Sequence, residues 1–585
     1  MRRVTARTSW IAALVLCVSA CSPAAPTPAP PGPSASAAPT PAAPSVATSP
    51  TVAPGSACTP LDDPAAKDWN SRTWYEVFVR SFSDSDGDGI GDLRGLTAKL
   101  DYLNDGDPAT TTDLGVGGLW LMPVAESPSY HGYDVVDYRA IERDYGTTED
   151  MKAFLAAAHE RGIEVIVDLV MNHSSSEHPW FKDAATPGSK HDDWYVWADE
   201  KPTWLGPSGQ VVWHGEGKRW FYGVFWEGMP DLNLRNAEVT AELEDIARYW
   251  LEDLGVDGFR LDAAKHFVED GKDAQVNTPE TKAWLAGFRA SVDAVKPDAL
   301  LIGEVYDPAK IAGPYVPDSL DMTFNFSLAT GIRLALQNGR VAPLATALGD
   351  TIASWPANQQ GSFLTNHDQT RIMNELYGDV ASARLAAFLL LTAPGTPFVY
   401  YGEEIGMTGK KPDERIRTPM RWTADPATAG FTAGSPWQAL SEDDPASVNV
   451  EAQLADPESL LATYHGLIRT RAANPALQAG LTLPVDGGAE PVIGWLRTTS
   501  GQVLLSVVNV SDAPVTDYGL TLDVGPLCGA VTARLVASVG AGGPGADPVA
   551  PTAPVVTAEG GLDAYAPLPV LPPRSGYLIA LEPAP

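Results

Sequence analysis

Four short segments of this sequence combine apolar residues with side chains able to carry acid–base chemistry. They cover residues 168–173, 258–262, 303–305 and 364–368. Arg260 and Asp262 stand two positions apart, so on a β-strand both side chains would project to the same face. Like charges gathered in a dry pocket are unfavourable, so Asp262, Glu304 and Asp368 in one place would indicate chemistry rather than packing. Such a trio suits nucleophilic attack and proton transfer by carboxyl groups.

A second acidic motif, at residues 84–92, has a spacing that suits a metal ion. Carboxylates alternate with small residues and a glycine occupies the sixth position, so the loop can wrap a hard cation with oxygen ligands. The candidate ligands are Asp84, Asp86, Asp88, Asp92 and the backbone carbonyl of Ile90. The twelfth position is Gly95 instead of the glutamate of an EF-hand, so the motif is not an EF-hand. We expect a structural Ca²⁺ here; an acidic turn without an ion is the alternative.

Short apolar or β-branched runs alternate with helical patterns from about residue 69 onward, as in a series of βα units. The predicted strands cover residues 74–79, 118–123, 164–170, 258–262, 300–305, 322–326, 363–366 and 398–401. The predicted helices include residues 148–161, 239–254, 281–295 and 382–391. Eight strands with intervening helices predict an α/β fold, a closed (β/α)₈ or TIM barrel with its active site at the carboxyl ends of the strands. The four chemical segments fall at those ends.

Two further parts are predicted around the barrel, which we place within residues 58–473. Residues 173–234 are too many for a simple βα loop and predict an inserted subdomain after the third strand. This insertion contains Trp180, Trp194, Trp197, Trp204, Trp213, Trp220 and Trp226. We expect most of these rings to build the core of the insertion, although aromatic rings also stack on sugars. After a helix predicted at residues 457–473, alternating runs at 492–496, 503–508 and 520–524 predict an all-β domain, a β-sandwich, over residues 474–585.

The first 20 residues have the features of an export signal. An apolar run, residues 10–18, is short for a bilayer span, and Arg2, Arg3 and Arg7 precede it. Residues 18–21 resemble a bacterial lipobox, which implies cleavage before Cys21 and a lipid on that cysteine; an ordinary signal peptide is the alternative. Residues 21–57 are rich in Pro, Ala, Ser and Thr and predict an extended spacer. We expect a protein held at the extracellular face of the membrane, or secreted.

Cysteine usage and charge narrow the setting further. Cys58 and Cys528 remain in the exported chain, and in an oxidising compartment they could form a disulfide; two separate thiols are the alternative. The formal net charge of −33 argues against nucleic acid as a partner, whereas a neutral polysaccharide is compatible with it. We expect a monomer that has no organic cofactor. It would contact the membrane only through its lipid anchor.

The four chemical segments closely resemble, in order, the four signature regions of the α-amylase family of glycoside hydrolases. The resemblance covers roughly residues 69–585 and includes the insertion and the C-terminal β-domain. It implies that Asp262 is the nucleophile, Glu304 the acid/base and Asp368 a carboxylate that stabilises the transition state. It also implies sugar-binding roles for Tyr133, His173, Arg260, Lys265, His266 and His367. Asn172 matches a ligand of a second family calcium site whose other ligands the sequence does not identify.

The chemistry that such an enzyme needs agrees with these assignments. A retaining glycosidase uses two carboxyl groups about 5–5.5 Å apart, one ionised and one protonated. We expect Arg260 to favour the carboxylate form of Asp262, and neighbouring carboxylates to raise the pKa of Glu304. Asp368 can then stabilise the charge that develops on the sugar.

The resemblance implies a retaining α-amylase that acts on starch and maltodextrins. Residues 229–233 and 417–422 also resemble segments of oligo-1,6-glucosidases, neopullulanases, α-glucosidases and trehalose synthases. An α-glucosidase, a maltogenic enzyme or a 4-α-glucanotransferase is therefore the alternative within the family. A non-catalytic glucan-binding surface lipoprotein is the alternative from another class.

Overall fold

A computed structural model describes residues 63–540 and 549–584 of the chain. The predicted signal, lipid-bearing Cys21, spacer and Cys58 all lie outside these residues. Eight parallel strands form a closed barrel in the order β1-β13-β12-β11-β10-β9-β5-β2. The strands are β1 (Trp74–Val77), β2 (Gly118–Leu121), β5 (Glu164–Leu169), β9 (Gly258–Leu261), β10 (Leu300–Gly303), β11 (Met322–Phe324), β12 (Gln360–Ser362) and β13 (Thr396–Tyr400). The predicted (β/α)₈ fold is confirmed.

One predicted strand is wrong in its position along the sequence. We placed the seventh strand at residues 363–366, but β12 ends at Ser362 and the apolar residues Phe363 and Leu364 follow it. The strand itself is made of small and polar residues because the barrel leaves no room there: a Cβ on Gly361 would stand 2.8 Å from the Ile302 side chain. An apolar run was therefore a misleading guide to this strand.

The inside of the barrel is filled by large rings below the site. Trp74 stacks on Phe398 with ring centroids 5.8 Å apart, and Trp120 lies 5.1 Å from Phe324. The guanidinium of Arg260 stands over the Trp120 ring, 5.4 Å from its centroid. This aromatic layer is a dry floor beneath the charged residues at the carboxyl ends of the strands.

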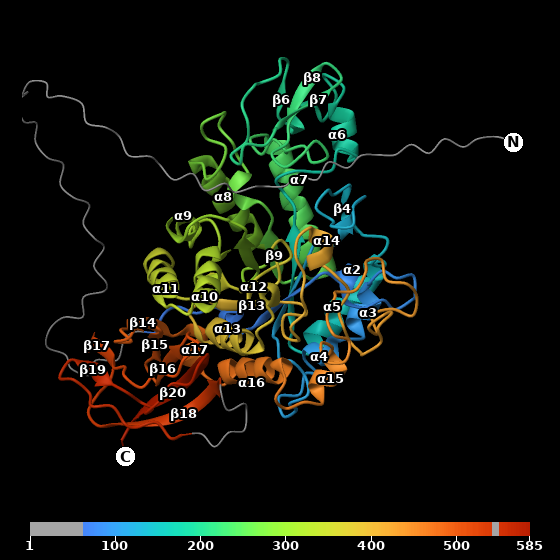
Figure 1. Ribbon diagram of the computed structural model, residues 1–585. Helices are drawn as coiled ribbons and strands as arrows, with labels where there is room; N and C mark the ends of the chain where they lie inside the picture. Colours follow the sequence, from blue (N-terminus) through green and yellow to red (C-terminus); the bar gives the residue numbers. More distant parts are fainter. Residues whose placement is uncertain (1–62, 541–548, 585) are drawn as a thin grey trace, which may run out of the picture. The chain divides into compact units, whose positions relative to one another are not determined.

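Helices surround the barrel where apolar periodicity predicted them (Figure 1). The predicted helices correspond to α5 (Thr148–Glu160), α7 (Ala237–Arg248) with its π-helical continuation η2 (Tyr249–Leu254), α8 (Pro279–Val295) and α13 (Val380–Thr392). Thr147 begins α5 with a capping box, in which its hydroxyl accepts from the Asp150 amide. Two further helices, α10 (Phe326–Asn338) and α11 (Ala342–Ser354), pack side by side after β11.

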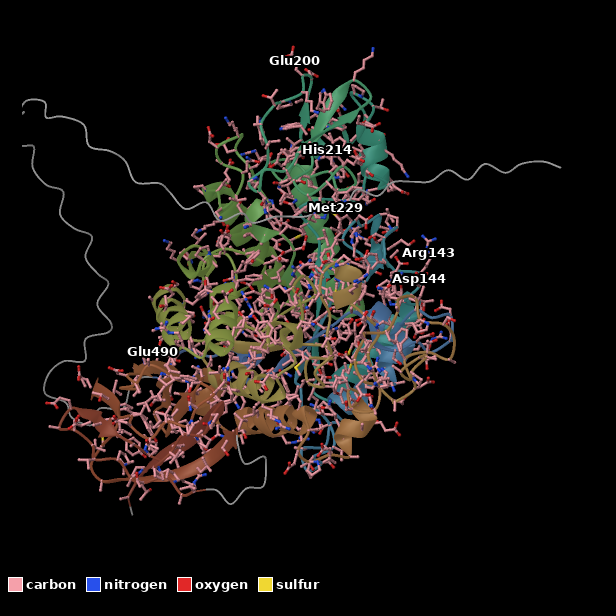
Figure 2. All side chains as sticks on the ribbon, viewed as in Figure 1. Arg143, Asp144, Glu200, His214, Met229 and Glu490 are labelled. Carbon is pink, nitrogen blue, oxygen red and sulfur yellow. The ribbon has the colours of Figure 1, made fainter. Side chains whose placement is uncertain are left out.

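The insertion after β5 forms its own small sheet. Its antiparallel strands are β6 (Trp197–Ala198), β8 (Arg219–Tyr222) and β7 (Trp213–Glu216), and His214 and Glu200 mark this region in Figure 2. Trp194 and Trp213 are buried, whereas Trp226 is 49% exposed. The insertion therefore uses some of its tryptophans as core and leaves at least one available at its surface.

The C-terminal region is all-β, as predicted. A five-stranded sheet has the order β14-β15-β16-β20-β18, and a second sheet pairs β17 (Leu520–Val524) with β19 (Gly560–Tyr565). The larger sheet contains β14 (Leu481–Val485), β15 (Val492–Thr499), β16 (Gln502–Asn509), β18 (Val531–Val539) and β20 (Ser575–Pro583). Trp495 is buried and donates to the Thr392 carbonyl of α13, so this sheet is anchored on a barrel helix.

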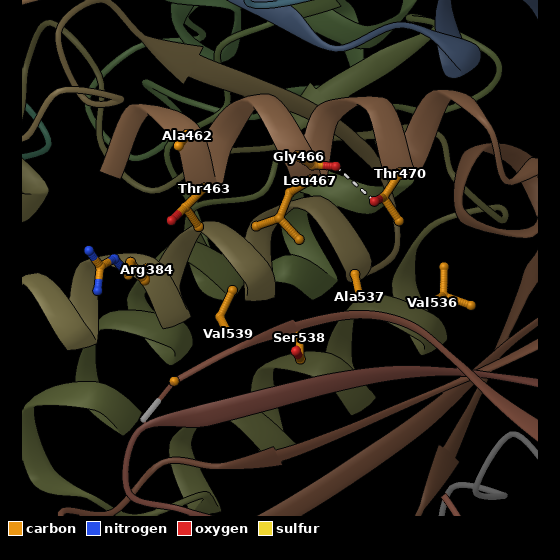
Figure 3. Close-up of a pocket in the computed structure, with 11 residues that line it drawn as sticks. Arg384, Ala462, Thr463, Gly466, Leu467, Thr470, Val536, Ala537, Ser538 and Val539 are labelled. Atoms are coloured by element: carbon orange, nitrogen blue, oxygen red, sulfur yellow. Dashed lines mark hydrogen bonds between the residues drawn. The ribbon is translucent and has the colours of Figure 1, made fainter. Parts of the chain in front are cut away.

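A crevice of about 250 Å³ remains between this sheet and the barrel helices (Figure 3). It lies between β18 and α16 (Leu460–Ala472), and Leu467 and Val539 line it.

In the described part of the chain, no helix is both long and apolar enough to span a bilayer.

Candidate active site

Adjacent strands bring the predicted catalytic residues to one rim of the barrel. Asp168 on β5 and Arg260 on β9 are direct partners in the parallel ladder. Asp262 follows β9 and Glu304 follows β10, the next strand around the barrel. Because parallel strands end at the same edge, all four side chains meet there.

Arg260 joins three carboxyl groups from these neighbouring strands. Its guanidinium is fully buried and donates to Asp262 Oδ1 at 2.6 Å and to Asp168 Oδ1 at 2.8 Å. Its other terminal nitrogen lies 2.9 Å from Glu304 Oε2. Because one rigid guanidinium contacts them both, Asp262 and Glu304 are close neighbours at this rim.

The third predicted acid, Asp368, lies near this group, since its charge raises the pKa of both Asp262 and Glu304. Arg417 donates to Asp368 Oδ1 at 2.8 Å, and the Arg417 Nε–H donates to the His367 carbonyl at 2.9 Å. The Asp368 side chain is 44% exposed, whereas that of Arg417 is 3% exposed. A buried arginine thus orients an acid that remains accessible to solvent.

Tyr133 and His367 form the wall between these two groups of acids. Their rings stack with centroids 5.6 Å apart. The Tyr133 hydroxyl donates to Asp168 Oδ2 at 2.9 Å, so the His367 Nε2–H at 2.7 Å must donate to Tyr133. His367 Nδ1 then accepts from protonated Glu76, whose Oε1 lies 2.6 Å away. Burial raises the pKa of Glu76 and lowers that of His367, in keeping with this neutral pair.

The electrostatics separate the two catalytic carboxyls on neighbouring strands. Burial raises the pKa of Glu304 to about 7, and the charges of Asp262 and Asp368 add to this shift against the opposing Arg260. Burial also raises the pKa of Asp262, but its short hydrogen bond from Arg260 opposes the shift. Glu304 is therefore suited to carry a proton near neutral pH, and Asp262 has the closest cationic partner.

Asp168 and Asp368 respond to their surroundings in opposite directions. Burial raises the pKa of Asp168 to about 7. Burial acts on Asp368 in the same sense, but the positive charge of Arg417 opposes it, and the pKa of Asp368 is lowered. The exposed acid of the site is thus kept ionised, as stabilisation of a cationic sugar requires.

Comparison with known proteins identifies the family. The model of the α-amylase catalytic domain matches residues 76–480. The chain belongs to the α-amylase family of glycoside hydrolases. Over 451 residues it is 40% identical to Alpha-amylase 3 of Dictyoglomus thermophilum, covering 76% of this chain and 85% of that protein. Over 501 residues it is 34% identical to the trehalose synthase/amylase TreS of Mycolicibacterium smegmatis, covering 75% of this chain and 82% of that protein.

A solved structure agrees with this assignment. The crystal structure of an α-amylase from H. orenii superimposes with a TM-score of 0.73 at 38% identity, covering 87% of this chain and 99% of that chain. The protein is therefore an enzyme of the α-amylase family with the barrel and the C-terminal β-sheets of that fold. The relatives carry different names, amylase and trehalose synthase among them, so the family does not by itself specify the substrate.

Two of the remaining predicted sugar-binding residues gather around one aromatic ring, and the third does not. His173 and His266 both approach the Phe225 ring, with ring centroids 5.3 Å and 5.6 Å from it. Lys265 turns away from them, because its Nζ donates to the Tyr306 carbonyl at 2.8 Å and to Asp307 at 3.1 Å. Burial, then the Lys265 charge, lowers the pKa of His266 to about 3, so this imidazole is neutral.

Several residues of the site were missed by sequence reasoning. Arg417 was noted only as part of a motif, and Asp168 only as a strand-end acid, yet Arg417 contacts Asp368 and Asp168 contacts Arg260. Glu76 and Phe225 had no signal of their own: one stands on β1, and the other is a 44% exposed ring in the insertion. Their roles depend on contacts across long sequence separations.

The acidic loop brings three of its predicted ligands together. One oxygen from each of Asp84, Asp86 and Asp88 lies within 4.8 Å of the others. Asp84 Oδ1 accepts from the Asp86 amide at 2.9 Å, which folds the loop around this carboxylate. Asp92, the fourth predicted carboxylate, caps α3 (Leu93–Thr97) by accepting from the Gly95 amide at 2.7 Å, and its other oxygen accepts from the Ser85 amide.

Asp88 carries the electrostatic trace of this crowding. Burial and the charges of Asp86 and Asp84 raise its pKa. Three mutually repelling carboxylates with convergent oxygens fit a hard cation, since such an ion would relieve the repulsion.

Asn172 has a neighbour that the sequence did not identify. Asp231 is buried, its Oδ1 accepts from the Val224 amide at 3.0 Å, and its Oδ2 has no hydrogen-bond partner. Burial raises the pKa of Asp231 well above its usual value, and the Asn172 side chain opposes this shift. The pair joins the end of β5 to the base of the insertion.

Proposed function

We propose that this enzyme hydrolyses the α-1,4-glucosidic bonds of starch and maltodextrins outside the cell, with retention of the anomeric configuration. The carrying observation is that Asp262 and Glu304 share the buried guanidinium of Arg260, while Asp368 lies close enough for its charge to raise the pKa of both. The export features of residues 1–21 support an extracellular, lipid-anchored location. A polymer too large for uptake is the substrate that such an enzyme would meet.

Each residue has a defined step in this mechanism. Asp262 attacks the anomeric carbon while Glu304 passes its proton to the glycosidic oxygen, which releases the leaving chain and forms a glycosyl-enzyme ester. Glu304 then takes a proton from water, which attacks the same carbon and frees Asp262. Asp368 stabilises the positive charge that develops on the sugar in both steps.

The acidic loop holds a structural ion in this proposal. Asp84, Asp86 and Asp88 would bind Ca²⁺ through carboxylate oxygens, and the ion would stabilise the loop between β1 and α3. Thr432 also donates to Asp84, so the ion would stabilise a contact between two distant segments. Catalysis requires no step at this ion.

A second specificity has one observation in its favour. Arg417 contacts Asp368, and the segment that carries it, residues 417–422, resembles that of α-glucosidases and trehalose synthases. An enzyme that trims glucose from chain ends, or transfers it to another sugar, is the second candidate. A merely glucan-binding protein is disfavoured because all three acids occupy one cavity.

Product analysis tests these proposals directly. Purified enzyme is incubated with soluble starch, pullulan and maltose, and early products are separated by thin-layer chromatography. A mixed ladder of maltooligosaccharides supports the amylase; glucose alone supports the α-glucosidase, and trehalose from maltose supports an isomerising enzyme. NMR at the start of the reaction should detect the α-anomer, and the β-anomer would rule out the double displacement.

The Asp262→Asn variant supplies the matching control. It keeps the shape of the side chain but removes the nucleophile, so we expect turnover to fall by about 10⁴-fold or more. Circular dichroism and glucan binding should change little. Near-normal turnover in this variant would exclude Asp262 as the nucleophile.

A further inference from the structure

Two buried arginines lie at the end of the barrel opposite the catalytic acids. Arg471 on α16 donates to the Gly395 carbonyl at 2.7 Å, directly before β13. Arg497 on β15 donates to the Asn358 side chain at 2.7 Å, two residues before β12. These are the amino ends of the strands, whereas the catalytic acids follow the carboxyl ends. We propose that Arg471 and Arg497 together bind a small inorganic anion of the size of chloride, where the C-terminal sheet meets the barrel.

Shared neighbours bring the two arginines to one place. Arg497 donates to the Leu477 carbonyl at 3.0 Å, in the short helix α17 (Pro475–Ala479) that follows α16 (Figure 1). Gln478 of the same helix donates to the Arg471 carbonyl at 3.1 Å. Burial lowers the pKa of Arg497 well below its usual range, and the charge of Arg471 lowers it further. The two positive charges are therefore close enough to repel each other.

The protein supplies no negative charge to balance this pair. Both side chains are fully buried, and their hydrogen-bond partners are neutral backbone carbonyls and the Asn358 amide oxygen. Within residues 63–540 and 549–584, neither guanidinium forms an ion pair with a carboxylate. An arginine keeps its proton inside a protein, so these groups cannot escape the cost of burial by becoming neutral. An uncompensated buried charge is unfavourable, and an anion between the two would compensate both.

Each arginine also keeps a donor that an anion could use. Arg471 Nε and Arg497 Nη1 are buried and have no hydrogen-bond partner among the described residues. The Ser506 hydroxyl of β16 is buried and unpartnered as well. Ser506 lies opposite Trp495 in the antiparallel ladder, and Trp495 is two residues from Arg497, so these side chains project from the same face of the sheet. This face therefore carries a third donor beside Arg497.

The free donors favour a one-atom anion over a larger one. A carboxylate or phosphate binds arginine best through two parallel N–H groups of one guanidinium. Here the other nitrogens are already engaged: Arg471 uses both of its terminal nitrogens on carbonyls, and Arg497 uses Nε and Nη2. A spherical ion needs only one donor from each side chain. Because α16 packs on the barrel and β15 belongs to the C-terminal sheet, the bound ion would stabilise their junction.

Thermal unfolding of the full-length enzyme in chloride and gluconate salts at equal ionic strength tests the inference, since gluconate is too large for a one-atom site. Arg497→Met removes one of the two charges. Arg534→Met is the matched control, because Arg534 lies on β18 of the same sheet and its 61% exposed side chain pairs with Glu582. The measurement is the melting temperature in chloride minus that in gluconate.

We expect this difference to be about 2–3 °C larger in the wild type than in Arg497→Met, for an anion present at about a hundred times its Kd. The control should keep the wild-type difference. Equal differences in wild type and Arg497→Met would overturn the inference.

Bromide locates the ion directly and needs no variant that folds. Anomalous diffraction from wild-type crystals grown in bromide should place an ion in contact with both Arg471 Nε and Arg497 Nη1. Diffraction that shows no bromide at these two nitrogens would refute the inference. The proposed glucan hydrolysis does not depend on either outcome, because the catalytic acids lie at the other end of the barrel.

Discussion

Replacement of Arg260 by methionine should destabilise the enzyme in a strongly pH-dependent way. Methionine preserves much of the apolar stem but removes the only charge that contacts Asp168, Asp262 and Glu304 together. These contacts, of 2.8, 2.6 and 2.9 Å, are made by a fully buried guanidinium. Removal of one partner from a buried ion pair costs about 3–5 kcal/mol, because the other charge stays buried.

The carboxyl groups can escape part of this penalty by taking up protons. The folded variant would then bind at least one more proton than the folded wild type at alkaline pH. Each extra bound proton lowers the free energy of unfolding by about 1.4 kcal/mol per pH unit as the pH rises. Because Asp168 and Glu304, each with a pKa of about 7, are largely protonated in the wild type below that pH, the additional destabilisation should grow by about 1.4 kcal/mol for each such proton between pH 7 and pH 8.

Urea unfolding at pH 5 and pH 8, followed by tryptophan fluorescence, measures this growth. Arg143→Met is the control, because Arg143 forms an exposed ion pair with Glu126, and such pairs contribute little to stability. Arg260→Lys should show a weaker dependence, since it keeps one charge. Equal pH dependence in wild type and Arg260→Met would refute the view that Arg260 lowers the pKa of these buried carboxyl groups.

Three further outcomes are expected. The kcat/KM of the wild type should fall as pH rises above about 7, because Glu304 must be protonated to act and its pKa is about 7. A substrate whose leaving group needs no proton, such as an activated aryl glucoside, should lack this fall. The same fall with both substrates would contradict the role of Glu304. Removal of calcium with EDTA should lower the melting temperature, since an ion at a hundred times its Kd stabilises by about 2.7 kcal/mol; Asp86→Asn together with Asp88→Asn should abolish this response, and a wild-type melting temperature indifferent to EDTA would count against the site. Glu403 is buried against the Tyr464 hydroxyl at 2.8 Å, and burial raises its pKa to about 8. Its folded form therefore holds a proton that the unfolded chain has lost, and stability decreases from about pH 4.5 to pH 8, so Glu403→Gln should gain melting temperature relative to wild type at pH 8 but not at pH 4; equal differences at both pH values would show that Glu403 does not titrate in this range.

The success of the fold prediction has a physical basis in particular elements. Strands such as β2 and β10 are continuous apolar runs because a parallel barrel buries both of their faces. β12 escaped this rule, since close packing around Gly361 replaced apolar bulk with small residues. The pattern of apolar residues predicts which strands are buried. It does not predict a strand whose side chains are kept small by close packing.

The site was predictable only where chemistry is local in the sequence. Arg260 and Asp262 are two residues apart on one strand, so their shared face followed from strand geometry alone. Asp92 shows what spacing leaves open: one of its oxygens caps α3, and the other accepts from the Ser85 amide of the acidic loop. Spacing alone did not indicate these two contacts.

The sequence by itself determined the barrel fold, the strand ends that carry the candidate catalytic residues, and the family of the protein. It could do so because the burial pattern and the motif spacing are properties of residues close together in the sequence. Only the tertiary structure decided that Arg260 contacts three acids at once, that Arg417 orients Asp368 and that Glu76 supports His367. It also decided that Arg471 and Arg497 lie close together where the C-terminal sheet meets the barrel. These contacts join residues up to hundreds of positions apart, and their distances and electric fields exist only once the chain has closed into a barrel.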